Sequence, residues 1–197
     1  MVIANILGIL IFLFLLWKKL KEDYSYERIF NLATLILIGL LVGFLISKKV
    51  LPEFWFFLEL IGVGIGFVIG VIKFKLNFFE TFEGVVIGFL PLLTLFFLSD
   101  SIKNSSLSSF LAFWLSLICI FLFFLVDTYY RSFSWYKSGR VGFSGVFIAG
   151  LFFLIRALIS IFFPDVISLS GNFEGYISGT LAFILFLLLF NLSRSEI

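Results

Sequence analysis

The stretch "GLFFLIRALISIFF", from Gly150 to Phe163, decides the class of fold. It is apolar apart from Arg156 and Ser160, and it continues an apolar run that begins near Val141. A helix that crosses the hydrocarbon core of a bilayer needs about 20 such residues. We therefore predict a transmembrane helix that carries an arginine well inside the bilayer.

The rest of the chain repeats this pattern. The 197 residues are 62% hydrophobic and only 13% charged, and the mean hydropathy is +1.21. Long apolar runs separated by short polar stretches are typical of a polytopic membrane protein. We predict an all-α integral membrane protein, a bundle of seven transmembrane helices that forms a single domain over residues 1–197. The predicted spans are residues 2–17, 29–47, 54–72, 82–98, 107–126, 141–163 and 175–192.

The lysines and arginines predict the orientation. Ten of the fourteen lie in the tail and in the loops after the first, third and fifth spans. Three lie on the opposite side, and the fourteenth is Arg156. Because basic residues favour the cytoplasmic side, we expect the N-terminus outside and the C-terminus in the cytoplasm, in a bacterial-type cytoplasmic (inner) membrane. Cations at membrane boundaries also give no reason to expect a nucleic-acid partner.

Two residue types limit the chemistry. The chain has no histidine, which is the commonest general base and metal ligand, and its one cysteine, Cys119, lies inside an apolar run. We expect no metal site, no cofactor and a buried, inert thiol.

The glycines of "IGVGIGFVIG", residues 61–70, have two interpretations. A phosphate-binding loop would follow a strand and open a helix in a soluble fold. Here Gly62, Gly66 and Gly70 recur every four residues inside an apolar span, and Gly84 and Gly88 repeat that spacing in the next span. We predict helix-packing seams, because glycines on one face let a second helix approach closely in lipid.

Three ionisable residues fall inside the predicted spans. Glu83 lies near the end of its span, where its side chain is expected to reach the interface. Glu59 and Arg156 are deeper, at roughly 9 and 11 Å from the outer boundary at about 1.5 Å per residue, so we expect them to face each other. An arginine at the centre of a span costs about 2.5–3.5 kcal/mol on insertion scales. Arg156 is therefore a structural ion-pair partner, a cation that binds a lipid phosphate in a cavity, or a side chain that snorkels to the interface.

Three stretches of the chain resemble one family. "LGILIFLFLLWKKLKEDYSYERIFNLATLILIGLLVGFLI" (Leu7 to Ile46) is similar to the first two helices and basic connector of the prolipoprotein diacylglyceryl transferases. "PEFWFFLELIGVGIGFVIGVIKFKLNFFETFEGVVIGF" (Pro52 to Phe89) resembles their glycine-rich third helix and the start of the fourth. "KSGRVGFSGVFIAGLFFLIRALISIFF" (Lys137 to Phe163) resembles their sixth helix, whose essential arginine matches Arg156. These bacterial enzymes move diacylglycerol from phosphatidylglycerol onto a lipoprotein cysteine.

The chain also departs from that family. Phe57 stands where the His-Gly-Gly-Leu motif has its catalytic histidine. The region of the Gly-Arg-x-Gly-Asn-Phe signature reads "PLLTLFFLSDSIKNSS" (Pro91 to Ser106), and the external insertion that follows in the family is missing. Glu59, two residues from Phe57, is the candidate base in place of the histidine.

The sequence thus supports three functions. The first is a divergent member of the diacylglyceryl transferase family that binds a phospholipid through Arg156 and Glu59, with Glu59 as catalytic base and a lipobox-bearing preprolipoprotein as acceptor. The second is a catalytically inactive relative that acts in lipid binding or assembly. The third is a small transporter that uses Glu59 as a coupling carboxylate.

Overall fold

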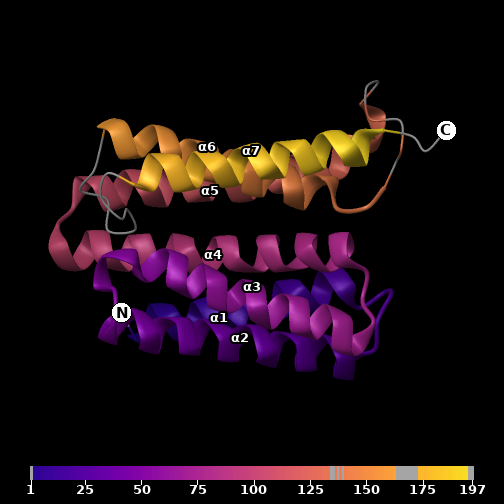
Figure 1. Ribbon diagram of the computed structural model, residues 1–197, viewed down its shortest axis with the longest axis horizontal. Helices are drawn as coiled ribbons and strands as arrows, with labels where there is room; N and C mark the ends of the chain where they lie inside the picture. The colour runs from indigo at the N-terminus through magenta and orange to yellow at the C-terminus, as the bar shows by residue number, and fades with distance from the viewer. Residues whose placement is uncertain (1, 134–135, 137, 139, 163–172, 195–197) are drawn as a thin grey trace.

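The computed structural model describes residues 2–133, 136, 138, 140–162 and 173–194. These residues form seven α-helices and two short 3-10 helices (Figure 1). The α-helices are α1 (Val2–Leu20), α2 (Tyr26–Lys49), α3 (Trp55–Phe74), α4 (Phe78–Asn104), α5 (Leu107–Tyr129), α6 (Phe143–Phe162) and α7 (Glu174–Ser193). The 3-10 helices are η1 (Pro52–Phe54) and η2 (Tyr130–Ser132). Each predicted span overlaps one α-helix.

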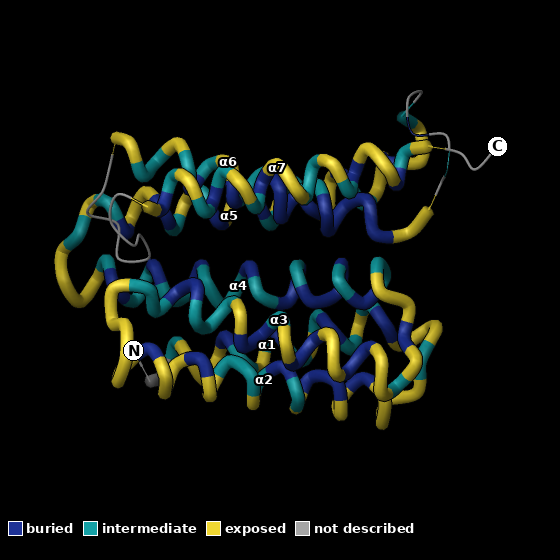
Figure 2. Tube along the Cα trace, viewed as in Figure 1, coloured by how far each residue is buried: buried dark blue, intermediate teal, exposed yellow. Residues whose placement is uncertain are grey.

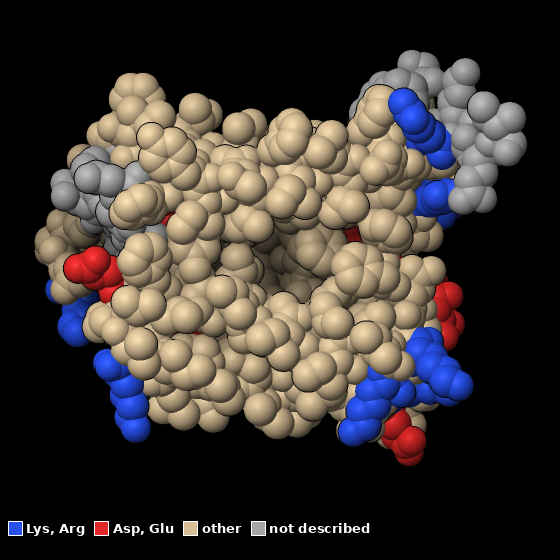
Figure 3. Space-filling view, in the orientation of Figure 1, with Lys and Arg blue, Asp and Glu red and all other residues tan. Residues whose placement is uncertain are grey.

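The helices have the length and composition of membrane spans. Six of them, α2 to α7, are long and apolar enough to cross a bilayer. The prediction of an all-helical fold is therefore confirmed, and six helices of this length and composition support a multi-pass membrane protein. The seventh span and the orientation remain predictions. On the face drawn in Figure 3, the lysine and arginine side chains gather at the two ends of the bundle, and the surface between the ends is almost entirely uncharged.

The helices lie in two groups on either side of α4. In Figure 1, α1, α2 and α3 lie below α4, and α5, α6 and α7 lie above it. The closest helix pairs are α2 with α3, α6 with α7, and α4 with α1 and α5. Figure 2 shows that the residues on the inner sides of these helices are buried and those on the outer sides are exposed. Exposed apolar side chains on the outer sides are what a bilayer environment requires.

Capping residues lie in the two turns that flank α4. Asn77 is the N-cap of α4, and its side chain accepts a hydrogen bond from the backbone N–H of Phe79 at 3.1 Å. Ser106 caps α5 in the same way by accepting from the N–H of Ser109. The residue before it, Ser105, adopts the left-handed conformation (φ 49°) that ends α4. These caps satisfy backbone groups that a helix end leaves unpaired.

The glycine seam of residues 62–70 lies against α2. A Cβ atom added at Gly62 would overlap the carbonyl oxygen of Gly39, and one at Gly66 would overlap the carbonyl oxygen of Leu35. A Cβ atom added at Gly39 would likewise overlap the carbonyl oxygen of Gly62. The backbones of α2 and α3 therefore touch directly, which only glycine permits.

The second glycine pair lies against α1. A Cβ at Gly88 would come within 2.7 Å of the Phe12 ring, and one at Gly84 within 3.2 Å of Leu16. Phe12 and Leu16 are fully buried. This seam holds α1 against the central helix.

Candidate functional site

A cavity of about 340 Å³ lies inside the bundle. Its walls come from α3, α4, α6 and α7, and α2 contributes Leu40. The volume lies within the roughly 300–1,000 Å³ range of ligand pockets. The lining includes Phe56, Leu60, Val63, Gly64, Phe67, Phe82, Phe89, Leu93, Ala149, Phe152, Phe153, Leu181 and Ile184.

The cavity opens on the side of the bundle. Figure 3 shows a hollow in the middle of the face drawn, between α3 and α7 as they lie in Figure 1. The lining residue Ile184 of α7 is also exposed, as are Ile61 and Ile65 beside the lining residues of α3. The opening is therefore bordered by exposed apolar side chains, which lipid would cover in a bilayer.

Glu59 is the one ionisable residue among the described side chains that line the cavity. It lies on α3, one helical turn from Phe56, which also lines the cavity. A carboxylate in apolar walls can fix the polar part of a ligand or accept a proton from it. The structure therefore places the predicted site residue Glu59 in the cavity.

Arg156 lies next to the cavity and is ion-paired. A terminal nitrogen (Nη2) of its guanidinium lies 2.9 Å from Oε1 of Glu174, and its Nε donates to the same oxygen at 3.1 Å. Ser178 also donates to that oxygen. The guanidinium stacks on the Phe56 ring at 3.8 Å from its centroid. Arg156 is 5% exposed and Glu174 is fully buried, so the pair is desolvated and its two charges offset each other.

The prediction that Glu59 is the partner of Arg156 is wrong. We expected Arg156 to face Glu59, but the carboxylate that pairs with it is Glu174, at the first turn of α7. The reason is the lateral arrangement of the helices. α7 packs closely on α6, which brings Glu174 to Arg156. The residue of α3 that contacts Arg156 is Phe56, and Glu59 of the same helix lines the cavity.

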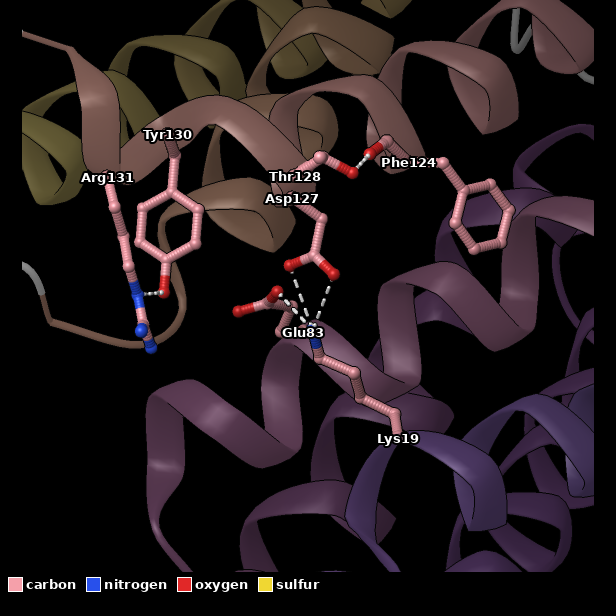
Figure 4. Close-up of polar contacts among 7 residues, drawn as sticks. All are labelled: Lys19, Glu83, Phe124, Asp127, Thr128, Tyr130 and Arg131. Carbon is pink, nitrogen blue, oxygen red and sulfur yellow. Dashed lines mark hydrogen bonds and ion pairs between the residues drawn. The ribbon is translucent and has the colours of Figure 1, made fainter.

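A second charged cluster ties three helices at the other end of the bundle (Figure 4). Nζ of Lys19 in α1 lies 2.9 Å from Oε1 of Glu83 in α4 and 2.9 Å from Oδ1 of Asp127 in α5. Glu83 is only 1% exposed, and α6 covers it, because a Cβ at Gly145 would lie 2.6 Å from the Cα of Glu83. The cluster is therefore an interior contact between helices that are distant in sequence.

The expectation that Glu83 reaches the interface is wrong. The side chain is enclosed by α1, α5 and α6, and a lysine from α1 neutralises it. Sequence reasoning also missed Asp127 and Glu174. Each is an acidic residue at the end of an apolar helix, opposite a basic residue of another helix, and this end placement was the available signal.

A tyrosine in a loop forms hydrogen bonds at the same end of the bundle as the Lys19 cluster. Tyr24, in the loop between α1 and α2, donates to Oε2 of Glu80 at 3.0 Å and accepts from the backbone N–H of Asn77 at 2.9 Å. Partial burial raises the pKa of Tyr24, so the hydroxyl keeps its proton and remains a donor at neutral pH. The contact joins this loop to the start of α4.

Comparisons with protein-family models, curated proteins and solved structures give no match for this chain. In the part of the chain that the structure describes, no group of three or more histidine, cysteine or acidic side chains is arranged to hold a metal ion. The chain is thus an all-helical bundle with six helices long and apolar enough to span a membrane and with an apolar side pocket.

Proposed function

We propose that the protein binds a phospholipid, with an alkyl chain in the cavity and the headgroup near Glu59 and Arg156. The observation that carries this proposal is the cavity itself. It is apolar, it opens on the side of the bundle among exposed apolar residues, and it contains one carboxylate. A chain of CH₂ groups matches such walls, and the polar residues lie at one end of them.

The position of Arg156 supports a headgroup at that end. Its guanidinium covers the Phe56 ring, and Phe56 lines the cavity, so one aromatic ring separates the cation from the cavity. Arginine binds phosphate oxygens through its planar N–H groups. Arg156 already pairs with Glu174. We therefore expect a phosphate to bind next to the ion pair, since Arg156 is not an isolated cation.

The proposal includes the finer features predicted from the sequence. We infer seven spans, an outside N-terminus and a cytoplasmic C-terminus in a bacterial-type inner membrane, which places Arg156 and Glu59 in the outer half of the bilayer. The resemblance to the prolipoprotein diacylglyceryl transferases supports phosphatidylglycerol as the lipid. The absence of their histidine and arginine signatures favours a divergent member.

Transfer chemistry is the second candidate, and the location of Glu59 favours it. In that reaction the thiol of a lipobox cysteine attacks the diacylglyceryl carbon of phosphatidylglycerol. The S–C bond forms, the C–O bond to phosphate breaks, and glycerol phosphate leaves. Glu59 would accept the thiol proton, as a general base must lie within reach of the proton that it takes.

Lipid retention tests the first proposal. The full chain is purified in mild detergent, and bound lipid is identified by native mass spectrometry beside the variants Arg156→Leu and Glu59→Gln. We expect wild type to retain phosphatidylglycerol and both variants to retain less of it. Retention of no lipid by wild type would contradict the proposal, and equal retention by all three proteins would remove both residues from the site.

The same preparation tests transfer. Wild type and Glu59→Gln are incubated with phosphatidylglycerol and a lipobox peptide, and the peptide is weighed by mass spectrometry. A diacylglyceryl mass added by wild type and not by Glu59→Gln supports the catalytic role of Glu59. Lipid retention without a mass shift would identify a non-catalytic lipid-binding protein.

A further inference from the structure

We propose that Gly64 determines how bulky an alkyl chain the cavity admits, with the chain entering from the bilayer between α3 and α7. This inference rests on the proposed lipid binding and adds a specificity-determining residue to it.

Gly64 differs from the other glycines of α3. A Cβ added at Gly64 meets no atom within 4 Å, whereas one added at Gly62 or Gly66 would overlap the backbone of α2. Helix packing therefore does not require a glycine at position 64. A larger side chain at position 64 would fit there without a clash. It would fill space that is empty because residue 64 is a glycine.

That open space belongs to the cavity. Leu60 and Phe67, about one turn to either side of Gly64, line the cavity together with it. The missing side chain leaves a notch between these two large residues. The next residue, Ile65, is 57% exposed on the outer side of α3, so Gly64 lies where the cavity wall meets the lipid-facing surface.

The opening has the same chemistry on both sides. Ile65 of α3 and Ile184 of α7 are exposed apolar residues, and Ile184 also lines the cavity. Extensive packing joins α2 to α3 and α6 to α7, but it does not join α3 to α7 within the described ranges. The walls beside Gly64 are apolar and offer water no hydrogen bonds, and walls left without a neighbour lose van der Waals contacts. The occupant that the surroundings supply is the alkyl chain of a neighbouring lipid.

Two lipids of different chain width test the role of Gly64. Wild type and the variants Gly64→Ala and Gly64→Phe are reconstituted with equal amounts of straight-chain and methyl-branched (diphytanoyl) phosphatidylglycerol. The lipids retained after mild detergent extraction are then measured by native mass spectrometry. The matched control is Ile72→Phe, which adds an aromatic ring to the same helix at an exposed position about two turns from Gly64 and away from the residues that line the cavity.

We expect the Ala variant to lower the ratio of branched to straight-chain lipid about tenfold, since single methyl groups in apolar pockets discriminate by roughly that factor or more. We expect Gly64→Phe to lose both lipids and Ile72→Phe to match wild type. The Ala variant keeps the test decisive if the Phe variant does not fold.

Two outcomes would overturn the inference, and they are distinguishable. If wild type retains lipid and the Gly64 variants retain the same lipids in the same ratio, Gly64 does not set the chain size, although lipid binding stands. If wild type retains neither lipid, the proposed function fails and the inference fails with it.

Discussion

The ammonium of Lys19 lies 2.9 Å from the carboxylates of both Glu83 and Asp127, so one cation serves two anions from two other helices. The two acids differ in environment, because the side chain of Glu83 is 2% exposed and that of Asp127 is 30% exposed. The cluster joins α1, α4 and α5 near the end of each apolar segment. Lys19 is its centre, since each acid contacts the same nitrogen.

This geometry predicts unequal effects of removing the charges. Lys19→Met leaves two carboxylates without their cation and should lower the free energy of unfolding by about 3 kcal/mol, the lower end for a broken buried pair, because Lys19 is partly exposed. Asp127→Asn leaves the Lys19–Glu83 pair neutral and should cost less. The midpoint of unfolding in an SDS titration, followed by tryptophan fluorescence, measures both. Lys18→Met is the control, because Lys18 is exposed. Equal losses for Lys19→Met and Lys18→Met would contradict a central role of Lys19.

The Arg156–Glu174 pair predicts strong coupling in a double-mutant cycle. Arg156→Leu or Glu174→Leu alone should destabilise the protein by about 3–5 kcal/mol, since each leaves a charge in a desolvated position. The double variant should recover most of that loss, because an apolar pair needs no counter-charge. SDS titration of all four proteins gives the coupling energy. Additive losses would show that the two residues act independently.

Two glycines of the same helix should respond in opposite ways to alanine. Gly62→Ala places a methyl group against the carbonyl oxygen of Gly39 and should separate α2 from α3, which lowers the unfolding midpoint. Gly64→Ala meets no atom within 4 Å and should be neutral or stabilising, by at most the roughly 1 kcal/mol that helix propensity favours alanine over glycine. Circular dichroism during the SDS titration compares them. A loss of stability in Gly64→Ala as large as that in Gly62→Ala would contradict the packing described for α3.

Chemical labelling tests the inferred orientation. Cys119 is 1% exposed, so the native chain should react little with a membrane-impermeant maleimide. We expect Glu53→Cys to react in intact cells and Asp23→Cys to react only after permeabilisation, because the loop before α3 is inferred to be outside. Acidic positions are suitable because acids contribute little to the orientation rule. An N-terminal epitope tag accessible from outside would show that α1 crosses the membrane, and a tag on the same side as position 23 would show that it does not.

The sequence by itself determined the helices and the seam of Gly62, Gly66 and Gly70. Backbone groups in a bilayer must pair within their own segment, so an apolar run of sufficient length can form only a helix there. A four-residue glycine repeat places its members on one face whatever the partner helix is. The location of Glu59 inside the bundle followed from the same physics, because an ionisable residue in a span avoids lipid.

Only the tertiary structure decided which charges meet. Depth along a helix can be estimated from residue number, but the lateral order of the helices cannot, and that order pairs Arg156 with Glu174 and Glu83 with Lys19. It also leaves α3 and α7 without extensive packing against each other in the described ranges, and the cavity between them has Glu59 and Gly64 in its wall. Contacts between distant helices depend on how all the side chains pack together, and a pattern within one segment does not specify which helix lies beside it.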